Sequence, residues 1–297
     1  MLINRANLST LFNALNAAFN KGFTGADNVY TKVAMVVPSS ASSETYGWLG
    51  TFPKMREWIG DRQIQNLAAA TYAIQNRKFE NTVSVGRTDI EDDRYGVFSP
   101  IMAEMGKSAA EHPNELVFSL LAEGFTSKCY DGQYFFDSDH PVTDASGANA
   151  SVSNTGGGSG TPWFLLDISR AIKPLVFQER LPYKLTALTE DNDENVFWKD
   201  EYIYGVRARS NAGFGLWQLA YGSKQTLDAA SYAAARAAMQ NMRGDGGRPL
   251  GIKPTLLVVP PSLESAGLKL LNSELATGGE TNEWKGTAEL LVTPWAG

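Results

Sequence analysis

The sequence contains one cysteine and two histidines in 297 residues, and it has no long hydrophobic run. The single cysteine, Cys129, excludes an internal disulfide and any multi-cysteine zinc site, which fits a protein that matures in a reducing cytoplasm. The longest apolar runs, such as residues 256–259, are far shorter than the ~20 residues needed to cross a bilayer. We therefore expect neither export nor membrane insertion.

The chain also lacks an excess of basic residues, with a formal net charge of −6 and a pI near 5.1. Nonspecific nucleic-acid binding depends on Lys and Arg side chains that displace counterions from phosphates. If this protein encloses DNA, we expect it to do so without binding a particular sequence. Its 43% hydrophobic and 20% charged residues are typical of a soluble protein with a large core in one or two domains.

Nucleotide-binding motifs are incomplete. Residues 106–108 (GKS) resemble the end of a phosphate-binding loop, but the glycine required five positions earlier is Ile101. Gly213 and Gly215 lack the third glycine of a dinucleotide-binding turn. We therefore expect no cofactor.

The calcium-loop pattern also fails. Residues 191–195 resemble the start of a calcium loop, but Val196 and Tyr202 occupy the positions that require glycine and a bidentate glutamate. This pattern predicts a solvated turn.

A second polar cluster consists of Asp137, Asp139 and His140, which precede a proline. The chain has no pair of histidines at metal-ligand spacing, so a hydrogen-bonded turn is the better interpretation. Cys129, His140 and a carboxylate could form a nucleophilic site if the fold brought them together. Catalytic cysteines need an activating environment, and this one follows an apolar helix. We predict no catalytic residue and no metal site.

An amphipathic helix is predicted near the N-terminus. Its apolar residues fall at helical spacing, and Gly22 supplies a stop. They are Leu8, Leu11, Phe12, Leu15, Ala18 and Phe19. The helix could pack on its own core or dock on a neighbouring chain, and sequence alone does not separate the two.

Residues 54–94 carry scattered apolar residues and matched charges, with seven basic and seven acidic side chains. Val83 and Val85 alternate with polar neighbours in residues 79–89, which predicts a strand. We interpret the segment as a long β-hairpin that leaves the body and returns. An ordinary solvated surface is the alternative.

A long helix is predicted from Ser99 and Pro100 to about residue 125, with one apolar stripe. The stripe comprises Ile101, Met105, Ala109, His112, Leu116 and Leu120. Pro113 should kink or split this helix, because proline removes a hydrogen bond. The glycine-rich residues 144–161 predict a flexible loop outside the core.

The remaining elements predict an α+β protein without repeats. Tyr202, Tyr204 and Val206 should share one face of a strand. Strands are predicted at 163–168, 201–209, 215–221, 255–259 and 287–292, with helices at 228–242 and from residue 262.

Several long motifs, in order, resemble the Mu major head subunit family over nearly the whole chain. They are residues 34–38, 45–58 (TYGWLGTFPKMREW), 129–142 (CYDGQYFFDSDHPV), 165–180 (LLDISRAIKPLVFQER), 213–220 (GFGLWQLA) and 244–261 (GDGGRPLGIKPTLLVVPP). The resemblance implies the Hong Kong 97 phage fold, with an N-terminal arm, an extended hairpin called the E-loop, a peripheral domain with a spine helix, and an axial domain.

The resemblance divides the chain into parts. The expected ranges are 1–47 for the arm, 48–94 for the E-loop, 95–143 and 191–222 for the peripheral domain, and 144–190 and 223–297 for the axial domain. The expected assembly residues are Leu11, Phe12, Leu15 and Phe19 in the arm, and Arg56, Glu57, Asp61, Arg62, Arg77, Lys78 and Glu80 in the E-loop.

The implied function is that of a major capsid protein of a tailed double-stranded DNA bacteriophage, a structural protein and not an enzyme. Hexamers and pentamers would form an icosahedral head in the virion, assembled in the host cytoplasm. The implied partners are a separate scaffolding protein, since the arm-like helix begins within ten residues of Met1, and also a portal, a possible decoration protein and the packaged DNA. An encapsulin-like nanocompartment, which would hold protein cargo, is the alternative.

Overall fold

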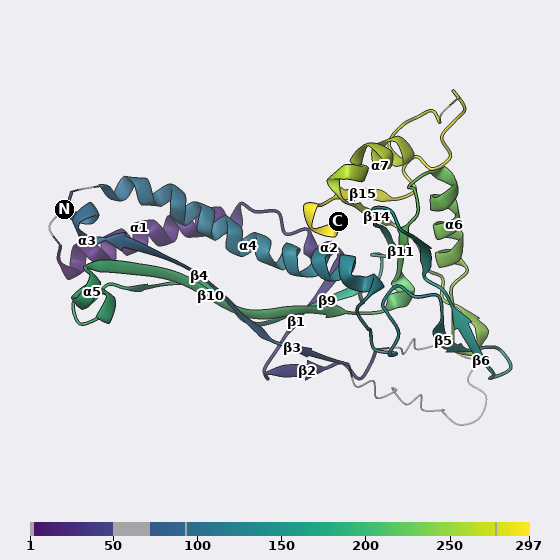
Figure 1. The fold of residues 1–297 in the computed structure, drawn as a ribbon, viewed down its shortest axis with the longest axis horizontal. Coiled ribbons are helices and arrows are strands. Elements are labelled where there is room, and N and C mark those ends of the chain that lie inside the picture. The colour runs from purple at the N-terminus through teal and green to yellow at the C-terminus, as the bar shows by residue number, and fades with distance from the viewer. Residues whose placement is uncertain (1–2, 50–71, 93, 277) are drawn as a thin grey trace.

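The computed structural model describes residues 3–49, 72–92, 94–276 and 278–297. Figure 1 shows an elongated part, built on two long helices and long strands, joined to a broader part that carries a second sheet with helices α6 and α7. This arrangement is α+β, as predicted. Within the described ranges, no helix is both long and apolar enough to cross a membrane.

A four-stranded sheet in the order β1-β9-β10-β4 forms the elongated part. The strands are β1 (Ala34–Pro38), β4 (Arg77–Gly86), β9 (Leu175–Leu188) and β10 (Glu201–Phe214). β10 is antiparallel to both β9 and β4, whereas β1 is parallel to β9. Alternate residues of β10, beginning at Tyr202, are buried, which confirms the predicted strand and its apolar face.

This sheet contains strands from three ranges that were expected outside the peripheral domain, including β1 from the expected arm at 1–47. Residues 175–188 were expected in the axial domain, but β9 pairs with β10 along most of its length. All ten residues of β4, which was expected to form part of the hairpin at 48–94, also pair with β10. The sequence showed the strands but not their pairing, because pairing is set by contacts between distant segments.

Two long helices cover one face of the sheet. They are α1 (Arg5–Thr24) and α4 (Phe98–Ala122). Asn4 caps α1 by accepting the backbone N–H of Asn7 at 2.8 Å, and the buried residues of α1 face α4 and the sheet. The predicted N-terminal helix is confirmed.

Helix α4 runs for 25 residues with Pro113 inside it, so of the two outcomes expected at this proline, a kink or a split, the split was wrong. Proline removes a single hydrogen bond, and Pro113 is buried among packed residues that hold the helix on both sides. The predicted stripe is correct at Met105 and Ala109, but Ile101 is 45% exposed because the buried face turns toward Met102 instead.

The broader part contains a five-stranded sheet in the order β15-β14-β8-β11-β7. The strands are β7 (Thr155–Gly158), β8 (Trp163–Leu166), β11 (Ala220–Lys224), β14 (Leu256–Val259) and β15 (Glu289–Val292). The two helices beside it are α6 (Ala229–Gln240), which begins with a capping box between Asp228 and Ser231, and α7 (Glu264–Leu271). These elements confirm the C-terminal helices and strands expected from the sequence.

Two local expectations need correction. Residues 144–161 do not lie outside the core, because β7 forms an edge of the second sheet and Asn154 is fully buried. The Asn154 side chain donates to the carbonyl oxygen of Phe135 at 2.8 Å, a contact that no apolar pattern reveals. The strand expected at 215–221 begins only at Ala220, after a short 3₁₀ turn.

Short elements complete the described chain. They are α2 (Tyr30–Val33), α3 (Arg87–Glu91), α5 (Glu194–Lys199), and the strand pairs β2 (Ser43–Thr45) with β3 (Ala73–Gln75), β5 (His140–Thr143) with β6 (Asn149–Val152), and β12 (Arg243–Gly244) with β13 (Arg248–Pro249).

Candidate functional site

The four arm residues that the sequence singled out lie against the body of their own subunit. Leu11, Leu15 and Phe19 are buried in the cluster that α1 forms with α4 and the long sheet. The ring of Phe12 is stacked on that of Tyr204, with centroids 6.5 Å apart. The apolar stripe is therefore used within the subunit, and any role of this helix between subunits stays a prediction.

The hairpin residues fall into two groups. Arg56, Glu57, Asp61 and Arg62 lie outside the described residues. The other three are exposed on β4, the edge strand of the long sheet, where they take part in its pairing with β10. They are Arg77, Lys78 and Glu80. This places them on the sheet itself, in the part of the expected E-loop that pairs with β10.

The end of the long sheet carries exposed aromatic side chains that the sequence analysis missed. Between β9 and β10, helix α5 presents Phe197 and Trp198, which are 70% and 78% exposed. Their rings make an edge-to-face contact with centroids 5.0 Å apart. Leu188, at the end of β9, is 50% exposed beside this turn. We call residues 188–201 the tip; two adjacent aromatics within an acidic stretch were the signal in the sequence.

The tip is held in place from within. The side-chain amide of Asn195 donates to the carbonyl oxygens of Leu188 and Glu201, at 3.2 and 2.7 Å, which joins the ends of β9 and β10. Asp200 ends the helix in the left-handed region with φ of 53°. Because Asn195 and Val196 point inward, the next two side chains of α5 point outward. The local sequence therefore fixes the aromatic pair in an exposed position.

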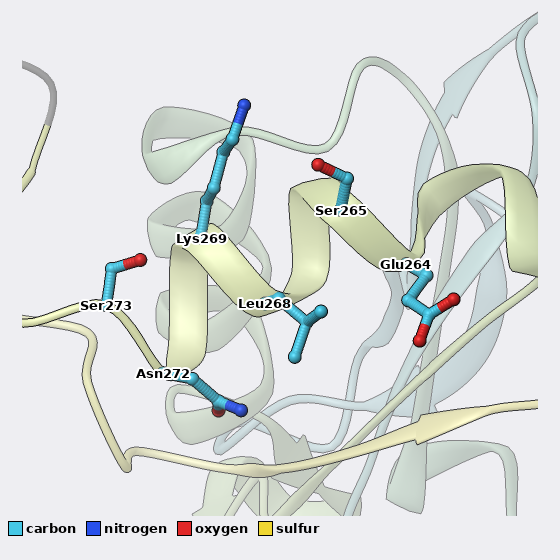
Figure 2. A pocket seen from close by; sticks show the side chains of 6 residues that line it. All are labelled: Glu264, Ser265, Leu268, Lys269, Asn272 and Ser273. Atoms are coloured by element: carbon cyan, nitrogen blue, oxygen red, sulfur yellow. The ribbon is translucent and has the colours of Figure 1, made fainter.

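A second exposed apolar side chain lies on α7. Figure 2 shows Leu268 on the helix face that also carries Glu264 and Asn272, whereas Ser265 and Lys269 point to another side. Leu268 is 41% exposed, and Leu275 beyond the helix is 60% exposed. A single leucine rimmed by polar groups on an open helix suits contact with another protein surface better than enclosure of a small molecule.

One buried polar cluster has the composition of a nucleophilic or metal site. The Cys129 thiol donates to Asp131 Oδ1 at 3.0 Å, and His140 Nδ1 lies 2.7 Å from Asp131 Oδ2. The three ligand atoms of these side chains lie within 4.8 Å of one another. The imidazole ring is stacked on Trp217 at 3.9 Å, with its Nε2 3.2 Å from Asn154 Oδ1. The structure thus brings Cys129 and His140 together, with Asp131 as the carboxylate.

The electrostatics of this cluster oppose nucleophilic chemistry. Burial, together with the nearby Asp131 carboxylate, raises the pKa of the Cys129 thiol, whereas a nucleophilic cysteine needs a lowered pKa. Burial by itself would raise the pKa of Asp131. Hydrogen bonds from His140 and Cys129 outweigh this effect and hold the pKa of Asp131 below its usual value. The carboxylate thus accepts from both neighbours, which is the arrangement of a structural hydrogen-bonded lock.

The acidic residues expected to form a turn do so beside this lock. The Asp137 carboxylate accepts the backbone N–H groups of Ser138 and Tyr134, at 2.7 and 3.2 Å. A hydrogen bond with the Asp137 carboxylate raises the pKa of Asp139. The hydrogen-bonded turn predicted at 137–140 is therefore present.

The surfaces and the fold can be compared with those of known proteins. The chain matches the family described as "Mu-like prophage major head subunit gpT" over residues 8–296. It is 45% identical to the major capsid protein of Escherichia phage Mu over 304 aligned positions, which cover 99% of this chain and all of that protein. It is 47% identical to the Mu-like prophage FluMu major head subunit of Haemophilus influenzae, over 90% of this chain and 89% of that one.

Solved structures agree with this match. The procapsid of bacteriophage JBD30 has a subunit that superposes with a TM-score of 0.88 at 47% identity, covering 99% of this chain and 100% of that chain. The JBD30 capsid gives a TM-score of 0.78 at 34% identity, with both chains fully covered. The family match and the solved structures define a major capsid protein of a tailed phage with the Hong Kong 97 fold, a structural protein and not an enzyme. The chain belongs to the Mu-like prophage major head subunit family, and the encapsulin-like alternative is not favoured.

Proposed function

We propose that copies of this chain assemble as hexamers and pentamers into an icosahedral head that encloses double-stranded DNA without sequence-specific binding. The net charge of −6 supports the absence of strong binding to DNA phosphates. We further propose that assembly takes place in the bacterial host cytoplasm, together with a separate scaffolding protein and a portal. The sole cysteine supports a reducing environment.

A decoration protein is part of the same proposal. One JBD30 capsid structure is decorated with minor capsid protein trimers, and its subunit superposes on this chain with a TM-score of 0.78 at 35% identity. We infer that the head formed by this chain accepts a protein of the same kind.

The parts of the subunit follow the strand pairing. We propose a peripheral domain made of α4 and the sheet β1-β9-β10-β4, and an axial domain made of the five-stranded sheet with α6 and α7. Relative to the ranges expected from the sequence, residues 175–188 and 77–86 move to the peripheral domain because both pair with β10, and residues 34–38 because they pair with β9. The E-loop is then proposed for the residues before β4, and the arm for the residues before β1.

The exposed aromatic pair at the tip is the observation that best supports the proposed assembly. Phe197 and Trp198 expose more than two thirds of their surface at the far end of the elongated part. Full burial of one large apolar side chain contributes about 1.5 to 3 kcal/mol, and a closed shell repeats each contact in every copy. Neighbouring subunits that covered this pair would therefore gain substantial stability.

The test is the double variant F197S/W198S, expressed with the scaffolding and portal proteins of its phage. Because neither side chain is buried, circular dichroism and thermal melting should match the wild type, while sedimentation and microscopy should show few or no shells. W198F, which retains most of the apolar area, is the matched control and should assemble. Normal shells from folded F197S/W198S would refute the role of the tip.

A further inference from the structure

The long sheet leaves part of one face uncovered. Helices α1 and α4 pack on the side that contains Leu185, Tyr202 and Val206. On the opposite side, alternate residues of β4 and β9 are exposed, including Lys78 and Lys184. Near β1, strands β2 and β3 cover this side, where the buried Gln178 side chain bonds to the Tyr46 hydroxyl and to the backbone oxygen of Ile74. The part nearer the tip stays exposed at Lys78, Lys184 and Arg207. We call its four basic residues, Lys78, Lys184, Arg207 and Arg209, the basic face.

The basic residues stand opposite each other in the sheet. In the register of β10 with β9, Arg207 pairs with Lys184, and in the register with β4, Arg209 pairs with Lys78. Like charges directly opposite one another destabilise a sheet. One acidic residue, Glu80, lies opposite Arg207 and offsets part of the repulsion between Arg207 and Lys184. The isolated subunit thus contains one uncompensated like-charge pair, Arg209 with Lys78, which an acidic partner would relieve.

The chain itself supplies an acidic surface. Residues 190–201 of the tip contain six acidic residues and one lysine. Within the described structure, Arg87 lies 4.0 Å from Asp191 and 3.8 Å from Asp200, and Arg5 lies 3.7 Å from Glu190. These contacts involve largely exposed carboxylates, so they neutralise the tip only in part. The tip therefore remains complementary in charge to the basic face.

We propose that the basic face of one subunit receives the acidic tip of a neighbouring copy. This inference rests on the proposed assembly and specifies one of its contacts. Because the two surfaces differ, the contact is heterologous and can repeat around a ring. Trp198 and Phe197 would lie over Arg207 and Lys184, where an aromatic ring stabilises a cation at close range.

The test reverses charges on both surfaces. K78E/K184E converts each like-charge pair into an opposite-charge pair, so the subunit should melt no lower than the wild type. Shells should nevertheless fall by about tenfold or more near 0.1 M salt, because the partner's acidic tip is then repelled. Adding E190K/E194K on the tip should restore shells in the fourfold variant. K78R/K184R retains both charges and is the matched control.

Three results would overturn the inference. Folded K78E/K184E that forms normal shells would show that the face is not a contact, and shells lost but not restored by E190K/E194K would exclude the tip as occupant. Short duplex DNA retained by wild-type subunits but not by K78E/K184E would identify a nucleic-acid surface instead. If the wild type and K78R/K184R both fail to form shells, the proposed assembly itself is wrong.

Discussion

The backbone oxygen of Phe19 in α1 lies 2.0 Å from the point where a Cβ on Gly106 of α4 would stand. A Cβ on Gly22 would likewise meet the backbone oxygen of Ala103 at 1.8 Å. The two helices therefore approach each other backbone to backbone, which only glycine allows at these positions. The N-terminal helix is a packed part of the subunit, fixed on α4 at two places.

Replacement of Gly106 by alanine should therefore destabilise the subunit by about 1 to 3 kcal/mol, since the added methyl group forces the helices apart. Chemical denaturation followed by circular dichroism measures this change. Gly96 is the matched control, because a Cβ there meets nothing within 4 Å. Equal stability of G106A and G96A would show that α1 moves away from α4 at little cost.

Apolar spacing predicted both helices, but in the sequence Gly106 was noticed only as part of an incomplete phosphate-binding loop. Its role in helix packing was not predicted. Spacing within a helix identifies the buried side, but the contact between two helices is set by tertiary packing. The same limit applies to the sheet: strands β9 and β10 were expected from composition, while their pairing with each other and with β4 was not.

The candidate surfaces were harder to predict than the fold. The apolar stripe of the arm was recognised correctly, but its packing within the subunit depends on contacts with distant segments, which helical spacing does not reveal. The exposed pair Phe197 and Trp198 was overlooked because large aromatics are usually buried, and a helix of six residues is too short for a periodic pattern. The burial of Asn154 was not predicted, because it lies in a glycine-rich segment and a buried amide adds nothing to an apolar pattern.

Acid should destabilise the subunit through His112. Burial lowers the pKa of His112 below 6.5, with a further contribution from Arg77 that Glu115 opposes. A histidine whose folded pKa is lowered binds protons more readily in the unfolded state, so stability falls as pH decreases through 6.5. H112Q should lose less stability than the wild type between about pH 7 and pH 5.

The two proteins are compared by how steeply the free energy of unfolding changes with pH. The absolute values differ anyway, because the substitution also removes the contact between His112 Nδ1 and the Tyr183 hydroxyl at 2.5 Å. The loss of this contact lowers the free energy of unfolding by a similar amount at every pH, about 0.5 to 1.5 kcal/mol. Parallel stability curves for H112Q and the wild type would contradict the prediction.

The lock of Cys129, Asp131 and His140 should behave as a structural element without metal. A chelator should leave the melting temperature unchanged, because the Asp131 carboxylate already accepts from both neighbours. The buried thiol, with its raised pKa, should react with a thiol reagent only on unfolding. A drop of several degrees on addition of a chelator would instead identify a bound metal ion.

The proposed E-loop should be needed for assembly and not for folding. Residues 56–71 can be replaced by a short Gly and Ser turn that leaves β4 intact, since removal as far as Glu80 would also take pairing from Arg207 to Ser210. We expect a folded subunit by circular dichroism and loss of closed shells by sedimentation. Normal shells would refute the role of the hairpin, and an unfolded product would place these residues in the core.

Microscopy of the particles formed by the wild-type chain tests the central claim most directly. When the chain is expressed with the scaffolding and portal proteins of its phage, the account predicts closed shells whose reconstruction has icosahedral symmetry, with hexamers and pentamers of this subunit and no protein cargo. Subunits that stay monomeric, form open sheets or enclose protein cargo would contradict it.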